Sequence, residues 1–132
     1  MKTTLRGLCA IAALAALPVL AERSIAISMD DSMRYSPAEI QVKRGEAVRI
    51  VATNRGKLMH EIVIGTRADL EAHAKHMREH PGMHHHEGSM LEVPAGETRE
   101  MRWRPTSAGE LFYGCLVPGH FEAGMVGRIV VE

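Results

Sequence analysis

Short apolar runs separated by turn residues make up most of the chain, and they limit the folds open to it. Strands are typically about five or six residues long, whereas a helix needs a periodic pattern over about ten or more. Turn sequences such as Asn54-Arg55-Gly56-Lys57 stand between the runs. This succession of short apolar runs and turns predicts an all-β sandwich of about seven or eight strands. The runs lie at 24–29, 40–42, 47–53, 60–64, 90–93, 98–104, 111–113 and 127–131.

One segment, residues 66–80, departs from this pattern and predicts a helix. It contains good helix formers, and Thr66 with Asp69 three residues later forms a weak capping box. Pro81 and Gly82 end it. We therefore expect one inserted helix followed by a loop rich in histidine and methionine, an insert of about residues 66–89 between two strands.

The first 21 residues predict a secretory signal peptide. Lys2 and Arg6 make the start positive, and the apolar run 8–20 is about 13 residues long, short of the roughly 20 needed to span a bilayer. Cleavage near Ala21 leaves a single domain, residues 22–132, with no membrane attachment. Export indicates an oxidising compartment, the periplasm in a Gram-negative source.

The charge of the exported domain argues against nucleic acid as a partner. The chain has 16 basic and 16 acidic residues. Loss of Lys2 and Arg6 with the signal leaves 14 basic residues against 16 acidic ones, a net charge of about −2. No basic stripe is present, so we do not expect nucleic acid as a partner.

The cysteine content raises a chemical question. Cys9 leaves with the signal peptide, so Cys115 is the one cysteine of the domain. It has no partner for an internal disulfide, and an exposed thiol in an oxidising compartment is open to oxidation. Either burial or a bound metal would protect it.

Three potential metal ligands lie at intervals of five in the stretch 114–125, which reads GCLVPGHFEAGM. Soft sulfur ligands favour copper(I), imidazole suits both copper oxidation states, and a His₂Cys set with a weak axial methionine is the blue-copper arrangement. The second histidine must come from elsewhere, and His60 opens a strand after a glycine-containing turn. We predict that a copper ion is bound at one end of the sandwich by His60, Cys115, His120 and Met125.

Cys-x₄-His-x₄-Met after Tyr-Gly, with an upstream histidine opening a strand, resembles the cupredoxins, or type 1 copper proteins. The resemblance covers essentially the whole domain. It is greatest to the small periplasmic cupredoxins associated with copper tolerance, which share His-Glu-Ile-Val-Ile-Gly, a His- and Met-rich insert and Pro-Gly-His-Phe-Glu-Ala-Gly-Met. The resemblance implies an eight-stranded Greek-key sandwich with one type 1 copper that cycles between copper(I) and copper(II).

The chain departs from the best-known members of that family beside the upstream ligand. Plastocyanins and azurins usually have asparagine there, where this chain has Glu61. Glu61 either joins the ligand loops in another way or points to solvent. The residues also separate the chain from two related classes. Multicopper oxidases flank the cysteine with histidines, here Gly114 and Leu116, and a purple-copper site needs a second cysteine in this loop.

Two functions follow from these features. One is an electron carrier, whose unknown redox partner docks near His120, at an edge framed by Leu116, Pro118 and Phe121. The other is copper homeostasis, for which the insert argues. We expect a monomer that is not an enzyme, because no nucleophile–base pair or open zinc site is visible, although a weak cuprous oxidase activity stays open.

The insert itself has two interpretations. His73, His76, Met77 and His80 recur at helical spacings of three and four, so they share one face. Met83, His84, His85, His86 and Met90 follow. The segment is either a solvated polar helix with a flexible loop or a second, labile copper site. Met59, beside His60, is interpreted as a packing residue.

Overall fold

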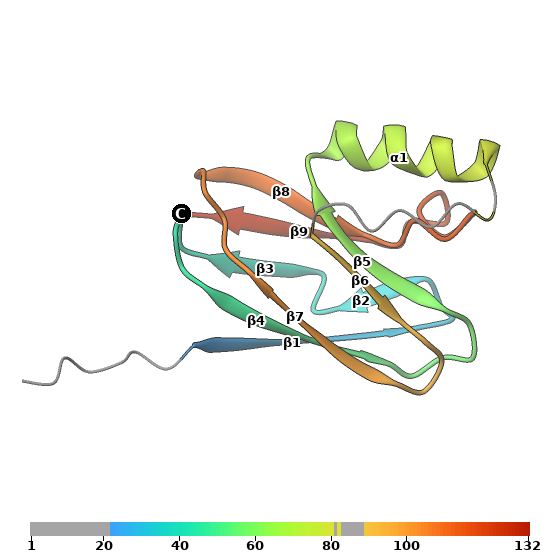
Figure 1. Cartoon of the computed structure of the whole chain (residues 1–132), viewed down its shortest axis with the longest axis horizontal. Helices are drawn as coiled ribbons and strands as arrows, with labels where there is room; N and C mark the ends of the chain where they lie inside the picture. Colours follow the sequence, from blue (N-terminus) through green and yellow to red (C-terminus); the bar gives the residue numbers. More distant parts are fainter. Residues whose placement is uncertain (1–21, 81, 83–88) are drawn as a thin grey trace, which may run out of the picture.

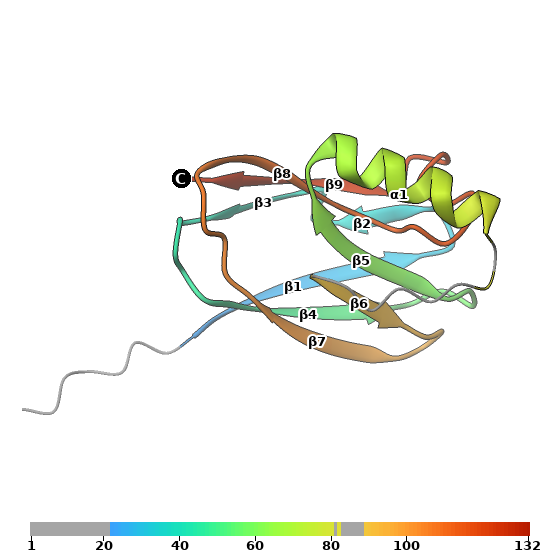
Figure 2. The same ribbon diagram turned by 45° about the horizontal axis from the view of Figure 1, so that its top comes forward.

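Two β-sheets lie face to face in the computed structural model, and one helix covers the outer face of the second sheet (Figures 1 and 2). The structure describes residues 22–80, 82 and 89–132, so the predicted signal peptide and the loop residues 83–88 lie outside it. The strands of the described part are β1 (Arg23–Asp30), β2 (Arg34–Ser36), β3 (Glu39–Val42), β4 (Val48–Asn54), β5 (His60–Gly65), β6 (Met90–Val93), β7 (Thr98–Trp103), β8 (Gly109–Gly114) and β9 (Val126–Val131), and helix α1 spans Arg67–Glu79.

The strand order confirms the all-β Greek-key prediction. One sheet has four strands in the order β2-β1-β4-β7, and the other has five in the order β3-β9-β8-β5-β6. The pairs β1–β4 and β3–β9 are parallel, and the other pairs are antiparallel. Eight of the nine strands coincide with predicted apolar runs. The unpredicted β2 is three residues long, too short to show an alternating pattern.

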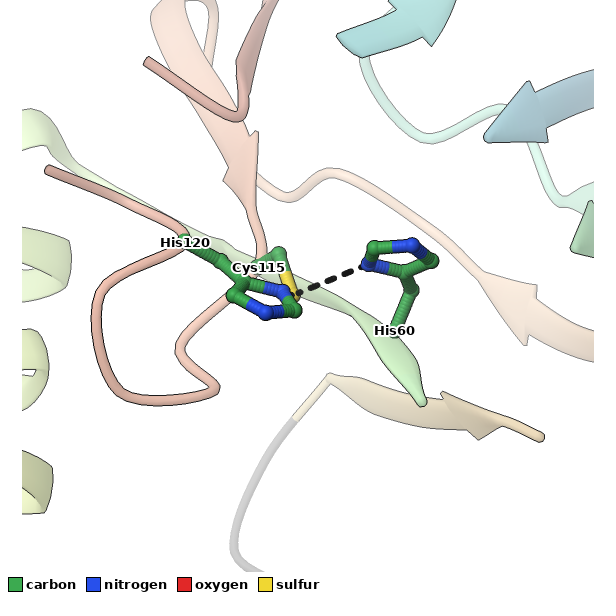
Figure 3. Close-up of side chains that lie close together, drawn as sticks. All are labelled: His60, Cys115 and His120. Carbon is green, nitrogen blue, oxygen red and sulfur yellow. Dashed lines mark hydrogen bonds between the residues drawn. The ribbon is translucent and has the colours of Figure 1, made fainter. Parts of the chain in front are cut away.

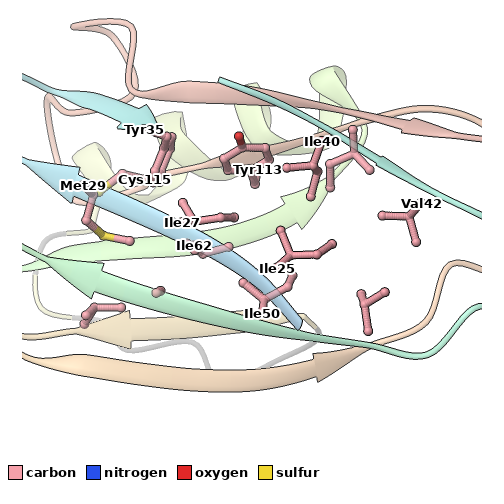
Figure 4. Packing of buried hydrophobic residues seen from close by; sticks show 14 of the residues in the cluster. Ile25, Ile27, Met29, Tyr35, Ile40, Val42, Ile50, Ile62, Tyr113 and Cys115 are labelled. Carbon is pink, nitrogen blue, oxygen red and sulfur yellow. The ribbon is translucent and has the colours of Figure 1, made fainter. Parts of the chain in front are cut away.

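The main core lies between the sheets and is built by alternation along the strands (Figure 4). In β1, Ile25, Ile27 and Met29 point inward while their neighbours are exposed or half-buried. Ile50 on β4 and Ile62 on β5 meet them from the two sheets. Each such side chain contributes about 1.5–3 kcal/mol on burial, so the alternating pattern that predicted the strands also accounts for the packing.

Helix α1 is the predicted inserted helix, and it begins at the predicted cap. The Thr66 side chain accepts a hydrogen bond from the Asp69 N–H at 3.2 Å. The helix buries Leu70 and Ala74 in a second cluster with Val63, Leu116 and Phe121. No helix within the described ranges has both the length and the apolar character that crossing a membrane requires.

Strand β5 is buried on both faces because the helix covers one of them. Its first four residues, His60 to Val63, are all buried. Ile62 belongs to the core between the sheets and Val63 to the cluster under α1. Since successive side chains of a strand alternate, His60 lies on the interior face and Glu61 on the face toward α1. Strand β5 thus separates the His60 side chain from the Glu61 carboxylate.

Candidate metal centre

A cluster of three predicted ligands lies at one end of the sandwich (Figure 3). His60 is the first residue of β5, Cys115 follows β8, and His120 lies in the loop that leads to β9. Their ligand atoms all lie within 4.8 Å of one another, and no other three His, Cys, Asp or Glu side chains of the described residues do so. The Cys115 sulfur is 3.3 Å from Nδ1 of His120 and 4.0 Å from Nδ1 of His60.

The fourth predicted ligand, Met125, is held beside this cluster by the backbone of its loop. The Cys115 N–H donates to the Met125 carbonyl at 3.1 Å, and the Met125 N–H donates to the His120 carbonyl at 3.1 Å. Met125 is fully buried in the same core cluster as Cys115. All four positions that the sequence singled out therefore meet at one end of the molecule.

The loop that carries three of these residues turns tightly, and glycine makes this possible. The His120 N–H donates to the Val117 carbonyl at 2.9 Å. Gly119 and Gly124 have φ angles of 88° and 92°, a region that side-chain-bearing residues rarely adopt. The eleven residues 115–125 can thus leave β8, present three side chains inward and enter β9.

The sulfur of Cys115 sits in a dry, hydrogen-bonded position. It is fully buried, and burial raises its pKa to about 12. Backbone N–H groups of Val117 and Glu61 donate to the sulfur and oppose this rise. Without a metal the group is a thiol at neutral pH, so a metal that binds here must displace its proton.

Asp31 orients His60 from the opposite side of the ring. His60 Nε2 lies 3.2 Å from an Asp31 carboxylate oxygen, which leaves Nδ1 facing the sulfur. The backbone N–H groups of Lys57, at 2.8 Å, and Leu58, at 3.2 Å, also donate to Asp31. These donors, Lys57 first, hold the pKa of Asp31 below its ordinary value. The sequence contained no signal for this role, because Asp31 lies in a turn of the other sheet.

Asn54 fixes the turn that precedes His60. Its side-chain amide donates to the carbonyls of Leu58 at 2.7 Å and Val93 at 2.8 Å, and its oxygen accepts from the Gly56 N–H at 2.9 Å. It is 1% exposed, so these bonds satisfy a buried polar group. The Asn-x-Gly sequence predicted the turn but not this buried anchor.

Glu61 is buried, so the interpretation in which it points to solvent is wrong. Its side chain is 6% exposed. Its backbone N–H donates to the Cys115 sulfur, and its carbonyl accepts from the Tyr35 hydroxyl. Main-chain groups of Glu61 and the side chains of Asn54 and Asp31 thus join the ligand segments.

The two imidazoles lie close together in a poorly solvated site. The His60 and His120 ring centroids are 5.0 Å apart, with their planes inclined by 51°. Burial lowers the pKa of His120, and the His60 ring lowers it further. A neutral imidazole nitrogen is therefore available to a metal at neutral pH.

The surface around His120 differs from the predicted docking edge. Leu116 and Phe121 are buried beneath α1, so they do not frame an exposed edge. Pro118 is exposed. The large exposed apolar side chains of the described residues are Leu58, 47% exposed, and Met59, 43% exposed, which also corrects the interpretation of Met59 as a packing residue.

This donor set fits copper. The sulfur of Cys115, the imidazole nitrogens of His60 and His120 and the neighbouring thioether of Met125 would hold the ion, and this set of donors favours copper over hard cations. The backbone donors to the sulfur and the carboxylate behind His60 are the supporting contacts that metal ligands need.

Comparisons with known proteins agree with this geometry. Residues 21–132 match the model of the family described as copper binding proteins, plastocyanin/azurin family. The chain is 50% identical over 112 residues to the copper-resistant cuproprotein CopI of Rubrivivax gelatinosus, covering 85% of this chain and 68% of that protein. It is 35% identical over 141 residues to CopI of Pseudomonas aeruginosa, covering 85% and 77%.

A solved structure with the same fold is reduced auracyanin from Roseiflexus castenholzii. Its TM-score is 0.73 at 20% identity, and the match covers 85% of this chain and 98% of that one. At this identity the likeness establishes the fold alone. With the matched family model and the four convergent ligand positions, the chain belongs to the plastocyanin/azurin family of copper-binding proteins, and copper is its cofactor.

Proposed function

We propose that this protein is a periplasmic type 1 copper protein that transfers single electrons and contributes to copper tolerance. The ligands in this proposal are Nδ1 of His60, the sulfur of Cys115, Nδ1 of His120 and the thioether of Met125. The observation that carries it is the buried Cys115 sulfur with two imidazole nitrogens facing it at 3.3 and 4.0 Å.

The residues of the site favour electron transfer because they are held in place. Asp31 fixes the ring of His60, two backbone N–H groups fix the sulfur, and backbone bonds fix Met125. Copper bound here would supply one-electron chemistry between copper(I) and copper(II). His60, Cys115 and Met125 are fully buried and exclude water. The His120 ring is 9% exposed, and we propose that electrons enter and leave through it.

The relatives support a role in copper tolerance. Two proteins at 50% and 35% identity are named copper-resistant cuproproteins. The second candidate is a dedicated electron carrier of a respiratory chain, which the shared site chemistry favours equally. We propose the periplasm as its location, because residues 1–21 have a signal-peptide pattern.

Spectroscopy of the copper-loaded protein tests the site. We expect an intense thiolate-to-copper(II) absorption band and a type 1 EPR signal, both absent in Cys115→Ser. A copper(II)-loaded protein without that band would contradict the assignment.

Growth of a deletion strain separates the two candidate roles. If the protein serves tolerance, the strain becomes copper-sensitive while respiration at low copper is unchanged, and the wild-type gene restores growth but the Cys115→Ser gene does not. A respiratory defect without copper sensitivity would favour the dedicated carrier.

A further inference from the structure

A second group of metal-binding side chains lines a small pocket between α1 and the edge of the five-stranded sheet. The pocket has a volume of about 10 Å³, room for one water-sized particle. It lies on the opposite face of β5 from His60. The lining side chains that could bind or surround an ion are Glu61, His73, Met77, Met90, Glu92 and Leu116.

Three elements bring these side chains together. In α1, His73 and Met77 are one turn apart, on the face that also buries Leu70 and Ala74 against the sheet. Strand β6 is the edge strand beside β5, and its register pairs Met90 with Val63 and Glu92 with Glu61. The helix therefore places the His73 imidazole and the Met77 thioether over the β5–β6 pair. That pair contributes the Met90 thioether and the carboxylates of Glu61 and Glu92.

The two carboxylates make the pocket favourable for a cation. Glu61 and Glu92 are direct partners across the antiparallel pair β5–β6. Side chains in such positions have Cβ atoms about 4.5–5.5 Å apart, and like charges there destabilise the sheet. Glu61 is also buried, with 6% of it exposed, so its carboxylate lies against the pocket and not in solvent. A monovalent cation in the pocket would be attracted by both carboxylates.

The donor atoms select the kind of cation. Among the described His, Cys, Asp and Glu side chains, only the His60–Cys115–His120 cluster brings three ligand atoms within 4.8 Å of one another. The pocket thus has no preassembled nitrogen–oxygen site for zinc or a hard cation. Its remaining donors are the thioethers of Met77 and Met90, which with an imidazole favour copper(I).

We propose that this pocket is a second copper site, specific for copper(I). His73, Met77 and Met90 bind the ion, and Glu61 and Glu92 supply countercharge. The inference rests on the proposed role in copper handling and adds to it a defined ligand set. Glu61 follows the ligand His60 and Leu116 follows the ligand Cys115, so the two sites lie back to back on one sheet. The proposed ligands all belong to the residues that the structure describes.

Copper(I) titration tests the proposal in the full exported domain. Under anaerobic, reducing conditions with a competing chromophoric chelator, we expect the wild type to bind two equivalents and Cys115→Ser to keep one. Adding Met77→Leu and Met90→Leu to Cys115→Ser removes the remaining equivalent. The matched control is Met101→Leu, a half-buried methionine on β7, in which that equivalent is retained. Leucine conserves volume, so the fold is expected to persist.

A second measurement uses the protein without substitutions in the pocket. With methyl-labelled methionine, silver(I), a redox-inert analogue of copper(I), shifts the NMR signals of Met77 and Met90 and leaves that of Met101 unchanged. X-ray absorption of copper(I)-loaded Cys115→Ser shows thioether sulfur scattering that disappears in the double methionine variant.

The outcomes separate this proposal from the proposed function. A Cys115→Ser protein that binds no copper(I), or that loses it only when His84, His85 and His86 are replaced by alanine, overturns the pocket site. Zinc(II) bound as tightly as copper(I) also overturns it. If instead the wild type lacks the thiolate absorption band while Cys115→Ser keeps its copper(I), the type 1 proposal fails and the pocket site stands.

Discussion

At the scale of single residues, the buried thiol of Cys115 links metal binding to the loss of a proton. Burial raises the pKa of its thiol to about 12, so the metal-free protein carries the proton at neutral pH. A metal takes the thiolate, so binding must release that proton. In the metal-free protein, burial therefore keeps Cys115 in the less reactive thiol form.

This predicts a proton count. On copper(II) binding in weak buffer at pH 7.5, we expect Cys115 to release one proton, and apparent copper affinity to rise with pH across the neutral range. Titration calorimetry in buffers of different ionisation enthalpy measures this release. Cys115→Ser is the control and lacks it; equal release by both proteins would contradict the prediction.

His120 predicts how the metal-free protein responds to acid. Burial, and next the His60 ring, lower its pKa from 6.5. A lowered histidine pKa means that the folded state binds fewer protons than the unfolded state, so stability is present above pH 6.5 and is lost as pH falls through the folded pKa. Urea unfolding at pH 7.5 and at lower pH should show this loss. In His120→Gln, the free energy of unfolding should fall less between these pH values. An equal fall in the variant and the wild type would contradict the role of His120.

Asp31 acts on the metal through His60. We expect Asp31→Ala to weaken copper(II) affinity by about 10–100-fold, the range for contacts that orient a metal ligand, with Asp31→Asn between it and the wild type. Competition with a chelator measures this. Asp30→Ala is a matched control, because the neighbouring Asp30 side chain bonds Ser32 and not a ligand. Equal loss in both variants would refute an orienting role.

At the scale of elements, helix α1 is an insert that depends on its cap and on its buried face. Thr66 bonds the Asp69 N–H, and Arg67 pairs with Glu71 at 2.7 Å on the exposed side. The buried side packs Leu70 and Ala74 on the sheet. The helix thereby covers β5, and it forms one wall of the pocket.

The cap predicts a measurable stability change. Thr66→Ala should lower the free energy of unfolding by about 1 kcal/mol, because it removes the oxygen that accepts from the Asp69 N–H. Thr66→Ser keeps this oxygen and should cost much less. Chemical denaturation checks both, and equal losses would mean that the methyl group, not the cap, is what matters.

At the scale of the whole molecule, the copper site joins segments that are distant in the sequence. The ligands come from β5 and from the β8–β9 loop, and Asp31 reaches His60 from the β1–β2 turn of the other sheet. Tyr35 of β2 also bonds the Glu61 carbonyl across the sandwich. The four ligand positions therefore belong to segments of the five-stranded sheet, and Asp31 and Tyr35 connect these segments to the four-stranded sheet.

We therefore expect copper to stabilise the folded protein. Free copper at about 100 times its dissociation constant should raise the free energy of unfolding by about 2.7 kcal/mol. Thermal unfolding with and without copper(II) measures the effect. A shift of the same size in Cys115→Ser would place the stabilising copper elsewhere.

Much of the fold and of the metal site could be predicted because the relevant information is local. Strand positions follow from alternation of neighbours, and the start of α1 follows from Thr66 and Asp69. The spacing Cys115, His120, Met125 lies within one loop, so its convergence needs no knowledge of distant contacts. Strand β2 could not be predicted, since three residues are too few to show a period.

By itself, the sequence determined the all-β class, the inserted helix and the candidate ligands of copper. Only the tertiary structure decided which side chains from distant segments contact these ligands and which line their surroundings. It placed Asp31 behind His60, buried Leu116 and Phe121 beneath α1, and set Glu61 opposite Glu92. These contacts depend on strand pairing and sheet packing between residues far apart in the chain, where shifting the register by a single residue would turn every side chain to the other face.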